Sequence, residues 1–451
     1  MNIFHIFELI IIKTKSDFIG IQAWLEAYHR TSCGYGPKQA LDHGDLEARV
    51  GSIQAAINLE IAHEKFTHLN VKVEGLNGQL PNLDLFNLIN RLSMKEGLPP
   101  MFQGNEDHSS SYWRSLKTFI TMAMKQAAGG VPSGNHGLFH RFGIESVTIE
   151  SVHKFTKKTR RREFSFFTAG RILEGVFRSL NNLLERFHQS FFFYLLASTK
   201  EYVSIGMYMP GFGCLAGSLL VKALGLWYQC LSEVNPDKKR EILSKSPNVV
   251  SVFPGWLLVH LTGILLAIVL PRSASVVGEK FDLNTDDSVS LAILAFCIFA
   301  IIMISRDSNS FGKSWRLVKC FALLEISVLA FAMSLVNFSL AYIVTLFLAP
   351  VAMFASPKKI KILLVLLVHP LSLIFGFCLI DTFRSFPEKS FLDLIWSGLS
   401  ASKQAIMFSI TDGYIYGNYT FITGAVFLLP CWLLIWHVCI SNVKEDKLKT
   451  E

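Results

Sequence analysis

Residues 317–355 read LVKCFALLEISVLAFAMSLVNFSLAYIVTLFLAPVAMFA. The stretch consists of two apolar runs, 317–335 and 338–355, which only Val336 and Asn337 separate. Each run is close to the ~20 residues that an α-helix needs to cross the hydrocarbon core of a bilayer. Asn is a frequent turn residue. The stretch therefore predicts a tight hairpin of two membrane helices with Asn337 in its turn.

Five further apolar runs of membrane length flank this hairpin. They cover residues 203–229, 249–270, 288–305, 360–380 and 421–440. Residues 1–200 instead mix polar and apolar stretches, as globular domains do. We therefore expect an α/β domain over 1–165, an amphipathic juxtamembrane helix within 166–200, an all-α bundle of seven transmembrane helices over 201–440, and a tail over 441–451.

The composition supports a membrane protein. Of the 451 residues, 51% are hydrophobic and only 17% are charged, whereas a soluble chain carries about 25% charged residues. This excludes a disordered chain, a fibrous repeat and a coiled coil. Only Cys33 of the eight cysteines precedes residue 200, which excludes a disulfide-rich domain. Cys33 is expected to be a buried or free thiol, with an intersubunit disulfide as the alternative.

Basic residues are divided unequally between the two sides of the predicted bundle. If residues 1–200 are non-cytosolic and the seven runs alternate, 14 Lys and Arg residues are cytosolic and five are not. The cytosolic set is Lys238, Lys239, Arg240, Lys245, Arg306, Lys313, Arg316, Lys319, Lys358, Lys359, Lys361, Lys444, Lys447 and Lys449. The positive-inside rule favours this orientation. It also explains much of the net charge of +8 without nucleic acid.

Periodicity in the first 200 residues predicts helices mixed with a strand, which indicates an α/β domain. Helices are expected over 16–30, 51–63, 84–95 and 113–128, and a strand over 142–153. A long amphipathic helix is expected over 171–196, with its apolar face on Ile172, Val176, Leu180, Leu183, Leu184 and Phe187.

No complete catalytic motif is present in the sequence. Histidines and carboxylates of the first half include Asp17, His29, His68, His136 and His140, which are residue types that zinc hydrolases use. His136 and His140 lie four apart, but Gly134 and Gly137 argue against a helix that would align them. We therefore expect no catalytic residue and no obligatory cofactor, and zinc stays open as the alternative.

Two features lie at membrane depth in the predicted bundle. Glu325 and the pair His369–Pro370 fall near the middle of their runs, and ionisable groups there are functional candidates. The last run carries Pro430, followed by Trp432 and Trp436 on one helical face. Such a bend beside aromatic rings suits a lipid that crosses from acyl chain to head group. The alternative is a packing kink with ordinary interfacial tryptophans.

Two short motifs concern modification and location. Asn418–Tyr419–Thr420 is a glycosylation sequon that abuts the last run, so we expect it to be unused. Lys447 and Lys449 stand fifth and third from the end of the sequence and match a dilysine address for the endoplasmic reticulum.

Several blocks together resemble the family of glycosylphosphatidylinositol (GPI) anchor attachment proteins, subunits of the GPI transamidase of the endoplasmic reticulum. They are DFIGIQAWLEAYH (17–29), GSIQAAINLE (51–60), EGLNGQLPNLDL (74–85), LLERFHQSFFFYLL (183–196), VSIGMYMP (203–210), NFSL (337–340) and LPCWLLIW (429–436). The resemblance runs from about residue 16 to 440.

The resemblance implies a luminal domain similar to zinc aminopeptidases with a mixed sheet, in which Asp17 is the position most like a metal ligand. It implies that this chain lacks a first membrane helix and an early part of that domain. It also implies a non-catalytic role: a caspase-like cysteine subunit cleaves the precursor protein, and this subunit helps to bind GPI through the region of Pro430. The competing interpretations are a membrane-bound metallopeptidase or amide synthase, and a seven-helix receptor or transporter.

Overall fold

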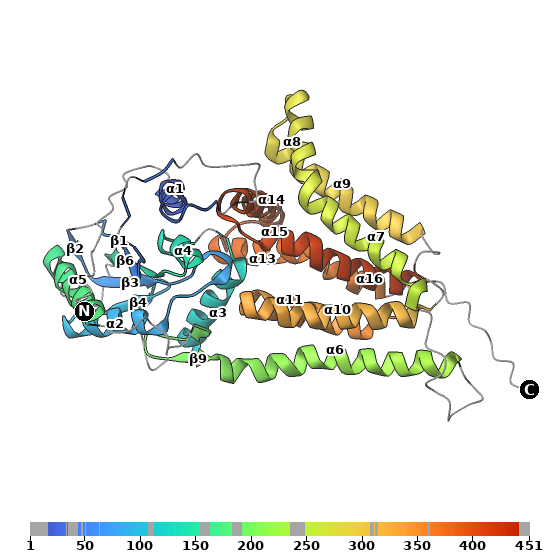
Figure 1. Cartoon of the computed structure of the whole chain (residues 1–451), viewed down its shortest axis with the longest axis horizontal. Coiled ribbons are helices and arrows are strands. Elements are labelled where there is room, and N and C mark those ends of the chain that lie inside the picture. Colours follow the sequence, from blue (N-terminus) through green and yellow to red (C-terminus); the bar gives the residue numbers. More distant parts are fainter. Residues whose placement is uncertain are drawn as a thin grey trace, which may run out of the picture. The chain divides into compact units, whose positions relative to one another are not determined.

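The computed structural model describes residues 17–32, 34, 44–46, 48–49, 51–62, 64–106, 112–130, 132–153, 163–182, 192–234, 249–306, 311, 314–358 and 361–441. The chain forms two compact units (Figure 1). The first, the α/β unit, contains residues 1–210 together with Val336–Leu340 and Asp412–Asn418. The second, the helical unit, contains Gly211–Leu335, Ala341–Thr411 and Tyr419–Glu451.

The α/β unit is built on a mixed five-stranded sheet in the order β1-β6-β3-β4-β5. Its strands are β1 (Ala55–Glu60), β3 (His68–Lys72), β4 (Pro100–Phe102), β5 (Asn105–Glu106) and β6 (Glu145–Val152). The pairs β1–β6 and β3–β4 are parallel, whereas β3–β6 and β4–β5 are antiparallel. This confirms the prediction of an α/β region with a mixed sheet.

Five helices accompany the sheet in the described part of this unit. They are α1 (Asp17–His29), α2 (Leu83–Lys95), α3 (Tyr112–Ala128), α4 (His136–Phe139) and α5 (Phe166–Asn181). Helix α2 begins where Asn82 accepts a hydrogen bond from the backbone N–H of Asp84, which satisfies a donor that the helix itself leaves unpaired. Its apolar face, with Phe86 and Ile89, is fully buried. The helices predicted over 16–30, 84–95 and 113–128 are therefore confirmed.

Two predicted helices of this unit are wrong in whole or in part. The segment 51–63 contains strand β1, which pairs in parallel with β6 along its whole length. The helix expected over 171–196 ends at Asn181, and Tyr194–Leu196 form strand β8, antiparallel to β9 (Tyr202–Ser204). Both errors have the same cause. A short apolar run is compatible with either a helix or a strand, and pairing with a second strand determines which of the two forms. Two-stranded pairing also joins β2 (Lys65–Phe66) to β7 (Phe164–Ser165).

Within the residues that the structure describes, five helices are long and apolar enough to cross a membrane: Ile205–Leu231, Val249–Lys280, Thr285–Arg306, Trp315–Val336 and Thr420–Ile440. They correspond to α6 (Ile205–Val234), α7 to α8 (Phe253–Lys280), α9 (Thr285–Arg306), α10 (Trp315–Val336) and α15 to α16 (Thr420–Ile440). A multi-pass helical region is thus confirmed, but the number seven is not.

The two remaining apolar runs differ from the other five in length or continuity. Helix α11 (Phe338–Phe354) has 17 residues. The run predicted over 360–380 is divided at His369 into α12 (Ile362–Leu367) and α13 (Pro370–Ser385). Pro370 lacks an N–H and cannot continue the preceding helix, and the His369 side chain accepts from the N–H of Leu371 instead. Helix α14 (Phe391–Tyr416) follows.

Helix α16 (Leu429–Ile440) is the central helix of the helical unit. It packs against α7, α9 and α12, and its residues from Leu429 to Cys439 are buried. A helix that is apolar on every side is expected to be surrounded by protein. The last apolar run, the one with Pro430, therefore lies inside the helical unit.

Candidate functional sites

Glu74 is the centre of a buried polar cluster in the α/β unit. It follows β3 directly and is only 5% exposed. Its Oε1 accepts hydrogen bonds from Lys125 Nζ (3.2 Å) and Ser133 Oγ, and its Oε2 accepts from Gln103 Nε2 (2.8 Å). Burial alone would raise the pKa of Glu74, but the charge of Lys125 and the hydrogen bond from Ser133 outweigh it and lower the pKa to about 2. The carboxylate therefore stays ionised and fully engaged.

His136 and His140 lie beside this carboxylate, on α4 and just after it. The Nδ1 of His136 is 2.7 Å from Thr148 Oγ1, and the Nε2 of His140 is 2.9 Å from the Ser146 carbonyl oxygen. Burial, reinforced by the neighbouring His140, lowers the pKa of His136 to about 3. Burial likewise lowers the pKa of His140 to about 4. Both imidazoles are therefore neutral at physiological pH.

These residues do not fit a zinc site. Each oxygen of Glu74 is held by hydrogen bonds from other side chains. Among the residues that the structure describes, no three His, Cys, Asp or Glu side chains come together as metal ligands. Asp17 is the first residue of α1, and its side chain lies outside the described part of the chain, as does Cys33.

A second polar cluster of the α/β unit surrounds the end of α3 and the two segments that come from later in the chain. Asn337 Nδ2 donates to the Gln126 carbonyl oxygen at 2.7 Å, and Ser339 Oγ donates to Gln126 Oε1 at 2.6 Å. Asn337 Oδ1 also accepts a hydrogen bond from the N–H of Leu340, in the first turn of α11. The predicted turn at Asn337 is confirmed, and its amide has a second role that the sequence did not reveal.

Asn418 belongs to the same cluster. Its Nδ2 donates to the Gly129 carbonyl oxygen at 3.0 Å, and the residue is 1% exposed. Glycosylation requires this nitrogen to be accessible. In this fold the acceptor nitrogen of the sequon is buried and hydrogen-bonded, and its lack of modification stays a prediction.

In the helical unit, Glu325 binds two aromatic side chains of α7. Its Oε2 accepts from Trp256 Nε1 at 3.0 Å, and its Oε1 lies 2.7 Å from His260 Nε2. The rings of the two partners contact each other with centroids 4.2 Å apart and planes tilted by 33°. Sequence reasoning singled out Glu325 by its depth but missed Trp256 and His260. Their spacing of four residues on one helix was the available signal.

Pro430 follows a π-helical segment, and a second helix deviates from α-helical geometry in the same way. Because π-segments and prolines are where helices bend, we refer to Gly424–Pro430 as the bend at Pro430. A π-helical segment, Gly424–Leu428, precedes Pro430, and another, Leu265–Val269, precedes Pro271. The two helices meet at Gly263, where an added Cβ would lie 2.4 Å from the Ala425 carbonyl oxygen and 3.0 Å from Pro430 Cγ. Proline removes a backbone donor, and π-segments are frequent at functional sites. The close packing at Gly263 fixes the bend.

Trp432 and Trp436 share one face of α16, as predicted, and stack with centroids 5.3 Å apart. Trp432 is fully buried, and its Nε1 donates to the Val365 carbonyl oxygen at 2.7 Å. Trp436 is 8% exposed and donates to Ser305 Oγ at 3.0 Å. Both rings are therefore covered by protein and hydrogen-bonded to it. Lys447 and Lys449 lie outside the described residues.

The chain is similar to a family of known proteins over almost its whole length. Residues 7–436 match the family model described as "Gaa1-like, GPI transamidase component". The chain is 30% identical to the GPI transamidase component gaa1 of Schizosaccharomyces pombe over 82% of its length. It is 29% identical to the GPI transamidase component GAA1 of Saccharomyces cerevisiae over 75% of its length. These matches span 58% and 50% of the two relatives. The comparisons do not favour a receptor, a transporter or a metallopeptidase.

Proposed function

Because the chain belongs to the Gaa1-like family of GPI transamidase components, we propose that it is a non-catalytic membrane subunit of GPI transamidase. In this role it helps to bind the GPI lipid and to present it for attachment to the C-terminus of precursor proteins. The observation that carries the proposal is the extent of the family match, from residue 7 to residue 436, which includes both the α/β unit and the bend at Pro430.

The state of the α/β unit supports a role without catalysis by this chain. Glu74 is neutralised by Lys125, and the neighbouring imidazoles are buried. A general base has to reach the proton that it abstracts, whereas Glu74 is held by the side chains of Gln103, Lys125 and Ser133 and both imidazoles are buried. We therefore propose that the caspase-like cysteine subunit cleaves the precursor and that this chain contributes binding.

We further propose an endoplasmic-reticulum membrane location with the α/β unit in the lumen and the C-terminal tail in the cytosol. This orientation places 14 basic residues in the cytosol and five on the other side of the membrane, as the positive-inside rule favours. In this topology α11 and the divided segment α12–α13 also cross the bilayer. The 17 residues of α11 span about 26 Å, close to the ~30 Å of a hydrocarbon core.

The bend before α16 is the proposed lipid contact. Residues from Leu429 to Cys439 are covered by protein, whereas Phe427 in the adjoining π-segment is 38% exposed. Pro430 sets the bend, and the stacked Trp432 and Trp436 anchor the helix below it. The lipid therefore contacts the π-segment, and Pro430, Trp432 and Trp436 hold that segment in place.

The test replaces Pro430 by leucine and measures GPI that co-purifies with the assembled complex. Leucine restores the backbone N–H that proline lacks, which straightens the helix. Recovery of the lipid should then fall about fivefold, which corresponds to a loss of ~1 kcal/mol of binding free energy. Pro271→Leu, at the other π-segment, is the matched control and should keep the lipid. Gly263→Ala should reproduce the loss, because its Cβ presses on Ala425 from the facing helix. Unchanged lipid recovery in Pro430→Leu, or loss of assembly together with lipid, would remove this bend from the binding site.

A further inference from the structure

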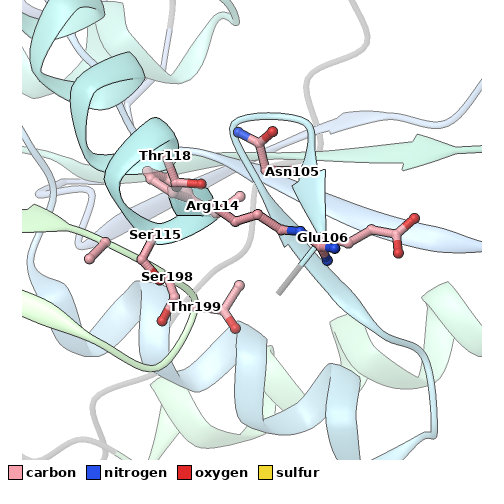
Figure 2. Close-up of a pocket in the computed structure, with 9 residues that line it drawn as sticks. Asn105, Glu106, Arg114, Ser115, Thr118, Ser198 and Thr199 are labelled. Atoms are coloured by element: carbon pink, nitrogen blue, oxygen red, sulfur yellow. The ribbon is translucent and has the colours of Figure 1, made fainter. Parts of the chain in front are cut away.

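A small polar pocket opens in the α/β unit between three elements. Its walls come from the first two turns of α3, from β5 and from the turn between β8 and β9 (Figure 2). Arg114, Ser115 and Thr118 lie on α3, and Ser198 and Thr199 lie on the turn. Both threonines are only 5% exposed. The pocket thus combines one guanidinium with several hydroxyl groups, which is a set that recognises phosphate.

Arg114 has no carboxylate that neutralises it among the described residues. Figure 2 shows it extending from α3 towards β5, while the carboxylate of Glu106 points away from it. The Glu106 carboxylate lies 3.5 Å from His68 Nε2. Ser198 Oγ accepts hydrogen bonds from the N–H groups of Lys200 and Glu201, so its own proton remains available to donate. The pocket therefore offers donors to an anion.

Two large aromatic side chains lie next to this pocket. Tyr112 and Trp113 begin α3, are each 75% exposed, and contact each other edge to face with centroids 5.8 Å apart. Lys117 on α3 and Lys200 on the β8–β9 turn are exposed as well. Amphipathic aromatic rings beside cationic side chains are the composition of surfaces that lie among lipid head groups.

The chain connects this surface to an apolar helix by a short segment. Strand β9 leads directly into α6, whose apolar stretch begins at Ile205. Thr199 precedes Ile205 by six residues, which is at most about 20 Å of extended chain, and Tyr202 between them is 43% exposed. The turn that lines the pocket is therefore tethered close to the start of a helix that is apolar enough to cross a bilayer.

We propose that the start of α3 and the β8–β9 turn form a binding surface for phospholipid head groups of the bilayer. Arg114 and the surrounding hydroxyls bind the phosphate, and Tyr112 and Trp113 insert among the head groups. This surface belongs to the α/β unit and is independent of the bend at Pro430. It holds the α/β unit against the membrane at a point that is distinct from the covalent connection through α6.

Photo-crosslinking of the full chain tests this surface. The photoreactive residue p-benzoylphenylalanine replaces Trp113 in one variant and Phe167 in a control, and each protein is irradiated in nanodiscs of phosphatidylcholine and phosphatidylethanolamine. Phe167 is 83% exposed at the start of α5, which Figure 1 places at the opposite end of the α/β unit from β9. Mass spectrometry should find phospholipid adducts at position 113 and few at position 167.

A second pair of variants separates the phosphate contact from mere proximity. Arg114→Gln should lower the phospholipid adduct at position 113 about tenfold, the effect of losing one charge-assisted hydrogen bond. Arg178→Gln, which removes an exposed arginine paired with Glu174 on α5, should leave the adduct unchanged. Adducts on another protein chain or on a glycolipid alone, equal yields at positions 113 and 167, or no effect of Arg114→Gln would overturn the proposal. None of these outcomes depends on GPI binding at Pro430.

Discussion

His136 and His140 make the stability of the α/β unit depend on pH. Burial lowers the pKa of His136 to about 3 and that of His140 to about 4 in the folded state, whereas an unfolded histidine titrates near 6.5. Below pH 6.5 the unfolded chain therefore binds more protons than the folded chain. The contribution of each histidine is complete above pH 6.5 and falls as the pH drops towards 4 and 3.

We expect acidification from pH 7 to pH 5 to lower the free energy of unfolding by about 2 kcal/mol per histidine. The double variant His136→Gln/His140→Gln should lose most of this pH dependence, whatever its stability at pH 7. Thermal unfolding of the full chain in detergent, followed between pH 7 and pH 5, measures it. An equally steep decline in the variant would show that other groups carry the effect. Glu74, with its pKa near 2, adds a further loss only below about pH 4.5.

At the level of single residues, the position of a residue within an apolar run and its type identified only some of the candidate sites. Glu325 and Pro430 stand out in the sequence because charge and proline are unusual in apolar runs. Glu74 does not, because its burial depends on Lys125, Ser133 and Gln103, which approach from other elements. Trp432 resembles an interfacial anchor until packing against Val365 and Trp436 is known.

Among the structural elements, the loop before α2 provides a sharp test of the packing against Asn337. Gly78 has a φ of +78°, and an added Cβ would lie 2.4 Å from Asn337 Nδ2. Gly97 has a φ of +75° with nothing within 4 Å. Both positions favour glycine, but only Gly78 is also confined by a neighbour.

We expect Gly97→Ala to cost about 1 kcal/mol, from backbone strain alone. Gly78→Ala should cost at least about 2 kcal/mol more, because the buried amide of Asn337 has to move away from its hydrogen bond. The midpoint of thermal unfolding, measured for both variants in the same detergent, distinguishes them. Equal midpoints would mean that the Asn337 side chain can move without loss of stability, and that the polar cluster around Asn337 is loosely packed.

Long periodic helices were predictable at the scale of elements, and short segments were not. Helices α2 and α3 follow from the sequence because their apolar faces repeat over three or more turns. Strand β1 reads AAINLE, which by itself fits a helix, and only its partner β6 makes it a strand. The π-segments before Pro271 and Pro430 were also missed, because a proline predicts a kink but not how the helix relieves it.

For the whole molecule, the charge asymmetry predicts the orientation. With 14 basic residues on the cytosolic side and five on the other, a tag at the C-terminus should be digested by protease added to intact microsomes. A tag in the α/β unit should be protected until detergent is added. Protection of the C-terminal tag would reverse the topology and with it the luminal assignment of the α/β unit.

The division of the chain into two units was only partly visible in the sequence. Composition separates a globular first half from an apolar second half. It gives no sign that Val336–Leu340 and Asp412–Asn418 belong to the α/β unit. Their assignment depends on side-chain amides, such as those of Asn337 and Asn418, that find backbone partners far away in the chain.

Purification of the tagged full chain from membranes in mild detergent tests whether it is a member of the GPI transamidase complex. Mass spectrometry then identifies the proteins that accompany it. We expect stoichiometric recovery of a caspase-like cysteine subunit and further transamidase subunits, with GPI lipid bound. Recovery of the chain alone, or with unrelated partners and without a cysteine protease subunit, would contradict it.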